Sequence, residues 1–524
     1  MRARAAVLAG LLAVAAASPA FALSVLNRGN GIEIKSLDPH FIDGINESQI
    51  EGDILVGLLT MDAAGAPIPG AATSWSTAPD GKTWIFHLRD HVWSDGHPVT
   101  AQDFVFAWRR LLDPATGASY AYNLWVLKNA HAISIGKLPP ASLGVAAPDD
   151  KTLVLTLEHP AAYLPELLTH DTAYPLPRHV VMAKGAAWSK PGNFVGNGPY
   201  LPREWMINAH LTLVKNPRFY DAAHVRIDVV NYWPTPDSNA ALDRLRAGEL
   251  DTQTPIPLQQ IGWIRAHMPE TLHIKPFLGL SYISINLHRP PLDDLRIRRA
   301  LNLAIDREVI AQKVLRLGEP PAYGIVPPSV ANYVPEQSLD FRPLPFAERL
   351  AKARWLMAQA GYGPDHPLYL TLETFDEPNN KRVAAVLQAM LRPIAVNLDI
   401  VAIDGAVHGR NLTSGNFELG VASWFADFND ATNFLDLLRS DAGNNYGRYS
   451  NPAFDAALDA AQQEPDAKKR AALLGAAERL ALKDYPWIPL RFRVTQDLVR
   501  PYVKGWVDNP RDMHRTRWLW LDRR

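Results

Sequence analysis

The segment 366–427 most constrains the fold, because strand and helix patterns alternate through it. PLYLTLETF predicts a strand, NNKRVAAVLQAML a helix, VNLDIVAI a second strand and FELGVASWF a third, after a short helix-like connection. This β-α-β-α-β order predicts a mostly parallel sheet, since parallel strands need crossover connections. Ligands bind beyond the carboxyl ends of the strands in such sheets. Asp427 directly follows the third strand, so we expect it at a binding site.

The rest of the chain has the same mixed pattern, which extends the α/β class to the whole molecule. Strands are expected at 82–89, 151–158, 225–233 and 281–287. Thr100 and Asp103 form the pattern of a capping box at the start of a helix. A second helix is expected to close at Gly248, and 292–315 reads as one long amphipathic segment. No flexible linker is visible, so the chain is expected to cross between lobes more than once.

Residues 1–22 have the pattern of a cleavable export signal. Arg2 and Arg4 precede a small, apolar run, and Ala20-Phe21-Ala22 is an A-x-A cleavage site. The run is shorter than the ~20 residues of a membrane span, which disfavours a membrane anchor. The chain contains no cysteine, which argues against disulfides and against a lipid anchor on an N-terminal cysteine. We therefore expect a soluble protein in the periplasm.

Charge and motifs disfavour nucleic-acid binding and catalysis. Lys and Arg number 53 against 54 Asp and Glu, so no basic field favours nucleic acid. Gly81-Lys82-Thr83 resembles the end of a phosphate-binding loop, but Ser76 stands where that loop needs a glycine. His87, His91 and His97 could bind zinc, yet they run through a turn that fixes no common face. We expect no enzyme, no cofactor and no bound metal.

Several segments together resemble a known family. They are LNRGNGIEIKSLDPHFIDGINESQI, ATSWSTAPDGKTWIFHLRDHVWSDGHPVTAQDFVFAWRRLLDP, PGNFVGNGPY, LDDLRIRRALNLAIDREVI, PAYGIVPP, SWFADFNDATNFLDLL and YSNPAFD. From about Leu26 to the C-terminus the chain is similar to the periplasmic oligopeptide-binding proteins of ABC importers, within extracellular solute-binding protein family 5. The resemblance implies a monomer that binds a peptide ligand and delivers it to a membrane permease.

The resemblance also implies a two-lobed clamp of the type II-like periplasmic-binding-protein form, with an additional domain in one lobe. The first lobe would comprise 23–55, 176–278 and 490–524, the extra domain 56–175, and the second lobe 279–489. The hinges would lie near Leu278-Gly279 and Pro489-Leu490. This organisation fits the absence of linkers.

A transporter of varied peptides can recognise their shared backbone by strand addition, with side chains pointing into roomy pockets. The resemblance assigns that pairing to Ser423, Trp424 and Phe425, opposite a facing segment of Asp43, Gly44 and Ile45. The ligand's α-amine, desolvated when the clamp closes, needs a buried counter-charge.

Asp427 matches the family's amine-binding acid in the motif WFADFND. The competing interpretation is a helix cap, because Asp427 and Asp430 both precede the apolar stretch ATNFLDLL. The family match favours ligand binding for Asp427 and a capping or loop role for Asp430. Tyr120 and Tyr282 match two cleft tyrosines of the family. For these tyrosines and for Trp424, a place in the hydrophobic core is the alternative.

The chain departs from the family where relatives hold the ligand's carboxylate. Relatives that bind short peptides at both ends have arginines six and fifteen residues before the amine-binding acid, and Val421 and Leu412 stand there. A family histidine falls at Asn380, and Arg410 lies two residues from a lost arginine and is a candidate substitute. We therefore predict that the ligand's C-terminus is bound weakly or differently.

Two alternatives to oligopeptide binding stay open. The same fold could bind another solute, such as a modified or cell-wall peptide, a sugar or a metal complex. An exported peptidase is the alternative from a different class, although no catalytic motif supports it.

Overall fold

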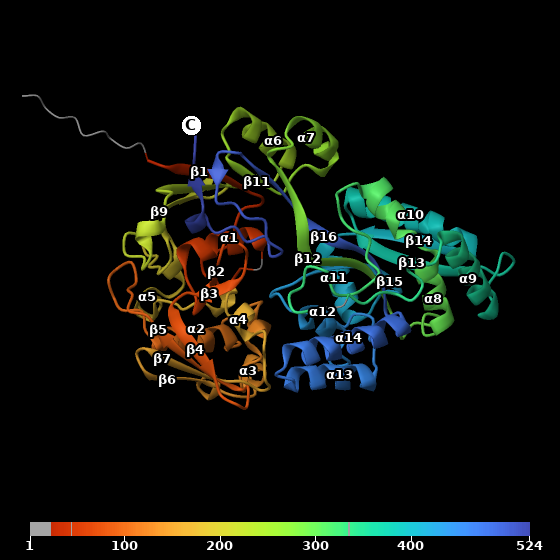
Figure 1. The fold of residues 1–524 in the computed structure, drawn as a ribbon, viewed down its shortest axis with the longest axis horizontal. Coiled ribbons are helices and arrows are strands. Elements are labelled where there is room, and N and C mark those ends of the chain that lie inside the picture. The colour runs from red at the N-terminus through yellow and green to blue at the C-terminus, as the bar shows by residue number, and fades with distance from the viewer. Residues whose placement is uncertain (1–22, 43, 334–335, 524) are drawn as a thin grey trace, which may run out of the picture.

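The computed structural model describes residues 23–42, 44–333 and 336–523, which form two lobes lying side by side (Figure 1). Two long antiparallel strands, β12 (Leu272–Ile285) and β16 (Trp487–Val499), run from one lobe into the other. Both belong to one sheet with the order β14-β13-β15-β12-β16-β11-β1-β10-β9-β8 among the described residues. The predicted hinge residues lie within these two strands, where the β12–β16 register shifts between Pro276 and Leu280. The predicted domain boundaries themselves remain predictions.

The first lobe is built on the N-terminal half of this sheet. Its strands are β1 (Val25–Asn30), β8 (Tyr200–Met206), β9 (His210–Lys215), β10 (Val229–Trp233) and β11 (Thr252–Thr254). Its helices include α1 (Ile45–Ile54), α6 (Ser238–Ala247) and α7 (Ile261–His267). The helix predicted before Gly248 is confirmed, since α6 ends there with Gly248 in the left-handed region at φ 83°.

A smaller antiparallel sheet packs below the first lobe in Figure 1, with the order β4-β5-β7-β6. Its strands are β4 (Ala72–Thr77), β5 (Thr83–Leu88), β6 (Val145–Asp149) and β7 (Thr152–Thr156), and α2 (Ala101–Leu112) lies with it. The predicted capping box of α2 is confirmed, because the Thr100 backbone N–H donates to Asp103 Oδ2 at 2.9 Å. One hydrophobic core runs from this sheet into the first lobe, so the two parts are packed as one body.

The predicted β-α-β-α-β unit forms the centre of the second lobe. It consists of β13 (Leu368–Phe375), α10 (Pro378–Leu391), β14 (Val396–Ile403), α11 (Gly405–Ser414) and β15 (Leu419–Phe425). β13 pairs parallel with both β14 and β15, as the sequence predicts. The helices α8 (Leu295–Ala304), α9 (Phe346–Gln359), α13 (Pro452–Gln463) and α14 (Ala467–Asp484) complete a separate hydrophobic core.

The amphipathic segment 292–315 is not one continuous helix. After α8 the chain breaks at 305–306, becomes helical again at 307–308 and continues as a π-helix at Val309–Leu315. The buried Arg307 guanidinium donates to the backbone oxygens of Asn302 at 3.0 Å and Pro489 at 2.7 Å. The Asn302 carbonyl is therefore occupied by a side chain instead of accepting from the next helical turn, which ends α8.

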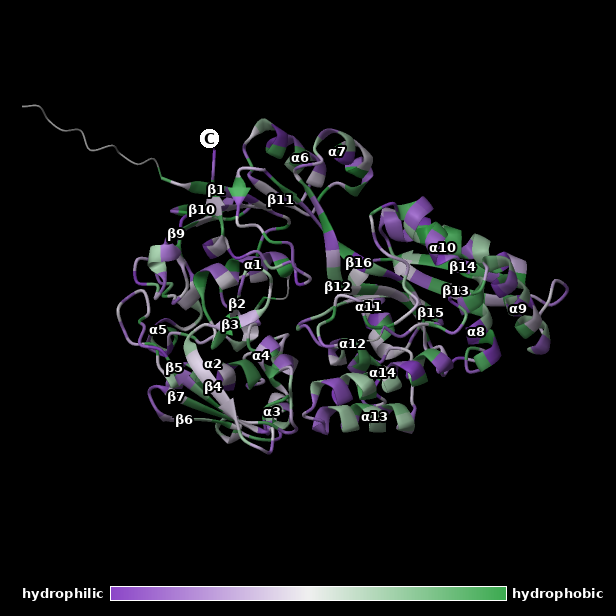
Figure 2. Cartoon of the chain, in the orientation of Figure 1, coloured by the Kyte–Doolittle hydropathy of each residue, from purple (hydrophilic) through white to green (hydrophobic). Residues whose placement is uncertain are grey.

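Apolar residues line the strands and the inner faces of the helices, whereas hydrophilic residues cover much of the outer surface (Figure 2). Within the described part of the chain, no helix combines the length and apolar character that a membrane crossing requires. The predicted signal, residues 1–22, lies outside the described residues.

Candidate ligand-binding site

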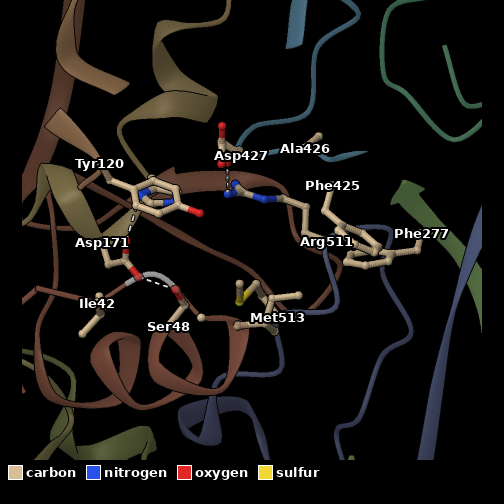
Figure 3. Close-up of a pocket in the computed structure, with 13 residues that line it drawn as sticks. Ile42, Ser48, Tyr120, Asp171, Phe277, Phe425, Ala426, Asp427, Arg511 and Met513 are labelled. Atoms are coloured by element: carbon tan, nitrogen blue, oxygen red, sulfur yellow. Dashed lines mark hydrogen bonds and ion pairs between the residues drawn. The ribbon is translucent and has the colours of Figure 1, made fainter. Parts of the chain in front are cut away.

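A cavity of about 100 Å³ lies at the carboxyl end of β15, where segments far apart in the sequence meet (Figure 3). The N-terminal segment contributes Ile42, Gly44, Ile45 and Ser48, and the part carrying the small sheet contributes Tyr120, His170 and Asp171. The remaining lining residues are Phe277, Phe425, Ala426, Asp427, Arg511 and Met513. The sequence-predicted residues Gly44, Ile45, Tyr120, Phe425 and Asp427 are thus brought together. Asp43 lies outside the described residues.

Gly44 and Ile45 begin α1 and are not part of a strand. Gly44 is the N-cap, and its N–H donates to Glu47 Oε2 at 3.1 Å. The backbone oxygen of Gly44 in turn accepts from the N–H of Ser48 at 3.0 Å. Gly44 itself has extended dihedrals, and α1 starts at the next residue.

The end of β15 presents backbone groups along one edge. Trp424 is aligned with Leu280 of β12, and the Ala426 N–H donates to the Leu278 oxygen at 2.9 Å. Alternate residues of an antiparallel strand direct their backbone groups to opposite sides. The N–H and C=O groups of Ser423 and Phe425 consequently point away from β12.

Among the described residues no strand pairs with that outward edge, because β13 pairs with β15 at Leu419 and Gly420 and not beyond. Beyond that point a buried histidine separates the two strands. His408 donates through Nε2 to the Val421 oxygen at 2.7 Å, and its Nδ1 lies 2.5 Å from Glu373 Oε1. The edge formed by Ser423 and Phe425 can therefore accept an added extended chain.

The Asp427 carboxylate is half-buried and lightly bonded. Tyr122 donates its hydroxyl proton to Oδ2 across 3.3 Å. The backbone of Asp427 is held more firmly: its N–H donates to Asn433 Oδ1 at 3.2 Å, and its oxygen accepts from Arg511 Nη2 at 2.9 Å. Burial raises the pKa of Asp427, while His170 and the Asn433 and Tyr122 side chains oppose that rise.

A buried acid–base pair lies beside Asp427. His170 stacks on the Tyr120 ring, with centroids 5.7 Å apart, and its Nδ1 is 2.8 Å from Asp171 Oδ1. Burial lowers the pKa of His170, but the carboxylates of Asp171 and Asp427 outweigh burial and leave the pKa above its usual value. Burial raises the pKa of Asp171, but His170 and a hydrogen bond from Ser48 bring it to about 2. Asp427 thus has neighbouring positive charge that favours its ionised form.

A second cavity of about 620 Å³ also reaches Asp427. Its walls are rich in aromatic rings, among which Tyr163 and Phe428 stack with centroids 4.7 Å apart. Trp424 lines it while donating its indole N–H to Asn433 Oδ1 at 2.8 Å. The other lining residues include Tyr122, Trp125, His131, His159, Asp436, Arg439 and Asp441. The side chains of a ligand bound at Asp427 would have ample room in this cavity.

Three predicted site residues lie elsewhere. Tyr282 is 1% exposed and stacks on Trp487 at 3.9 Å, which is a place in the hydrophobic core. Asn380 is on the first turn of α10 and donates to Glu377 Oε2 at 3.2 Å. Arg410 is exposed on α11. None of the three lines either cavity at Asp427.

Of the two roles predicted for Asp430, capping or loop, the structure shows the loop role, because the N-cap of α12 (Thr432–Leu435) is Ala431. Asp430 Oδ1 accepts from the N–H of Thr432 at 3.0 Å. The same carboxylate forms a buried two-point ion pair with Arg470, at 2.7 and 2.8 Å. The Asp430 oxygens thus bond to other groups of the protein, whereas the Asp427 carboxylate has unused lone pairs.

Sequence reasoning missed Tyr122, His170, Asp171, Asn433 and Arg511. Tyr122 is two residues from Tyr120. The sequence therefore indicated the correct segment, but not which of its side chains reaches Asp427. Arg511 is 84 positions from Asp427 in a loop without a local motif. Only the folded chain brings these residues together.

Comparison with known proteins identifies the family. The model for bacterial extracellular solute-binding proteins, family 5 Middle, matches residues 66–446. The chain is 36% identical to the periplasmic oligopeptide-binding protein OppA of Escherichia coli over 99% of this chain and 97% of that protein. The chain belongs to family 5 of the extracellular solute-binding proteins. The predicted resemblance is confirmed, and family 5 consists of binding proteins rather than enzymes.

Other family 5 members show how varied the ligands of close relatives are. The probable deoxycholate-binding periplasmic protein YgiS of Escherichia coli is 38% identical, over 95% of this chain and 94% of that protein. The structure of Haemophilus influenzae OppA in complex with RPPGFSPFR superposes with a TM-score of 0.81 at 35% identity, covering 95% and 99% of the two chains. The Escherichia coli murein tripeptide-binding protein MppA superposes with a TM-score of 0.83 at 34% identity, covering 95% and 98%. The predicted two-lobed α/β fold with an extra domain is thereby confirmed.

Proposed function

We propose that this protein is the periplasmic binding component of an ABC importer and captures peptides in extended form between its lobes. The observation that carries the proposal is the open edge of β15 next to the Asp427 carboxylate. Backbone pairing at such an edge is independent of side-chain identity, which suits a carrier of many sequences. The large cavity beside Trp424 then accommodates whatever side chains arrive.

The peptide's α-ammonium pairs with Asp427 in this proposal. Among the described residues the carboxylate is bonded by the side chains of Tyr122, across a long 3.3 Å, and Asn433, so it retains lone pairs for an ammonium. Its backbone is fixed from both sides by Asn433 and Arg511, which preorganises it. Asp427 lines both cavities. A bound peptide needs space on both sides of this point, because its first side chains branch off next to its amine.

The ligand's carboxylate is held weakly or at another position. Val421 and Leu412 stand where short-peptide binders have arginines. Their side chains are 8% and 4% exposed and carry no charge that could bind a carboxylate. The imidazole of His408 is already engaged with Glu373 and the Val421 oxygen. Ligands without a carboxylate at a fixed distance, such as longer peptides or cell-wall peptides, are therefore expected to bind.

A thermodynamic cycle tests amine recognition. Calorimetric titration would compare the unmodified protein and Asp427→Asn, each with a free and an N-acetylated peptide. We expect a coupling of about 2–5 kcal/mol, or about 30-fold to several thousand-fold in affinity. Equal losses on acetylation in both proteins would contradict the pairing. Titration with C-terminally amidated peptides should cost little, and a large loss would refute weak carboxylate binding.

Mass spectrometry of the solute that co-purifies with the protein separates peptide carriage from its alternatives. Intact peptides support the proposal, and peptide fragments would indicate a peptidase. A non-peptide solute such as a bile acid, as YgiS is named for, would overturn peptide carriage.

A further inference from the structure

A second cluster of ionisable groups lies behind the cavity wall, away from Asp427. Asp497 on β16 meets Asp512 and His514 of the C-terminal segment, and one ligand atom from each lies within 4.8 Å of the others. The side chain of Asp497 is fully buried, and His514 Nε2 is 3.1 Å from Asp512 Oδ1. Two carboxylates and an imidazole thus share one small, largely buried region.

Buried oxygen atoms at this cluster lack hydrogen-bond partners. Asp497 Oδ2 and Gln253 Oε1 are both buried without a partner among the described residues, and both side chains line one cavity of about 10 Å³. The Gln253 amide nitrogen donates to the Pro255 oxygen at 2.9 Å, which leaves its oxygen as an acceptor. Orphaned acceptors of this kind are costly, and the cavity has room for one ion or one water molecule.

The protein's own cations do not satisfy these oxygens. Arg28 lines the same cavity, but its Nη1 donates to the His514 oxygen at 2.9 Å and to Thr516 Oγ1 at 3.1 Å. Trp506 covers the imidazole of His514 at 3.7 Å between centroids. Asp508, on the same segment, is paired with His273 at 2.9 Å outside the cluster.

We propose that Asp497, Asp512 and His514 bind one divalent transition-metal ion. Two carboxylate oxygens and an imidazole nitrogen are ligands that Zn²⁺ and Mn²⁺ accept, and the nitrogen favours such metals over Ca²⁺ or Mg²⁺. Gln253 lines one cavity together with Asp497 and His514, so a water molecule held there could bridge the Gln253 oxygen to the ion.

The ion would fasten the segment that forms one wall of the ligand cavity. Residues alternate along this segment. Arg511 and Met513 line the ligand cavity (Figure 3), whereas Asp512 and His514 meet Asp497 of β16. Metal binding should therefore hold Arg511 where it donates to the Asp427 backbone. This consequence for ligand affinity rests on the proposed function, whereas metal binding itself does not.

Metal binding is tested first without any peptide. The full chain, free of a histidine tag, would be stripped with chelator and titrated with ZnCl₂ and with MnCl₂ alone. The titrations use a His97→Ala, His179→Ala background, because Asp95, His97 and His179 form an exposed cluster that could also take metal. We expect one equivalent bound and a higher Tm with metal. Failure of both metals to bind would overturn the site.

Matched carboxylate variants locate the metal. Asp512→Asn should weaken binding at least about tenfold, whereas Asp508→Asn, on the same segment but outside the cluster, should keep it within about threefold. Equal affinity in both variants would overturn the assignment. If Asp512→Asn fails to fold, His514→Gln gives the same comparison, with circular dichroism as the check on folding. Peptide titration with and without metal then measures the coupling to Asp427 separately.

Discussion

Asp427 and Asp430 are three residues apart in the chain, but their carboxylates have different roles. Both Asp430 oxygens accept hydrogen bonds, from Arg470 and from Thr432, whereas the Asp427 carboxylate is bonded only by the side chains of Tyr122 and Asn433 among the described residues. The difference arises from neighbours contributed by distant segments, not from the local motif. A carboxylate with unused lone pairs beside a cavity is suited to bind a ligand.

His170 makes amine binding depend on pH. The pKa of His170 and that of Asp427 both lie above their ordinary values. Lowering the pH from about 7 to about 5 therefore charges His170 and begins to neutralise Asp427, and both changes oppose an incoming ammonium. We expect about tenfold weaker peptide binding at the lower pH, measured by calorimetry.

The variant His170→Gln provides the control for that titration. Without the imidazole, only the Asp427 proton remains to oppose the ligand, so the affinity should change less across the same range. An unaltered pH dependence would rule out His170 as the titrating group.

At the scale of elements, His408 determines where the free edge of β15 begins. Its ring bridges Glu373 on β13 and the Val421 oxygen on β15, and it is 0% exposed. His408→Leu would leave the buried Glu373 with only the Asn411 amide as a side-chain partner among the described residues, which should lower the free energy of unfolding by about 3–5 kcal/mol. Urea denaturation measures the loss.

A second substitution distinguishes the ion pair from simple packing. Adding Glu373→Gln to His408→Leu removes the unpaired charge and should restore part of the stability. If the double variant is less stable than His408→Leu alone, the charge is not the cause.

Elements with a strong local pattern were predictable from the sequence. The β-α-β-α-β unit, the Thr100 cap and the Gly248 stop depend on residues close in the chain, and the structure confirms them. The break after α8 was not predictable, because Arg307 ends the helix by bonding to Pro489 on a distant strand. The same limit applies to Tyr282 and Arg511. The burial of Tyr282 and the hydrogen bond from Arg511 to the Asp427 backbone both depend on tertiary packing.

At the scale of the whole molecule, both lobes contribute to one cavity and are connected through β12 and β16. A ligand that contacts both lobes stabilises the arrangement in which they are closest. We predict that a peptide reduces the radius of gyration in small-angle X-ray scattering.

The same peptide with an acetylated N-terminus serves as the control, at a concentration at which only the free peptide binds. It should leave the scattering unchanged. An unchanged radius with saturating free peptide would contradict closure.

The segment 509–515, which forms one wall of the ligand cavity, determines when that cavity is completed during synthesis. A ribosome releases a chain from its N-terminus onward, so Arg511 and Met513 are delivered after all the other residues that line the cavity. Until they arrive, the Asp427 carbonyl lacks its guanidinium donor and β12 lacks the Pro510 oxygen that accepts from Leu278. The cavity wall is therefore completed only after all the other residues that line the cavity have been synthesised.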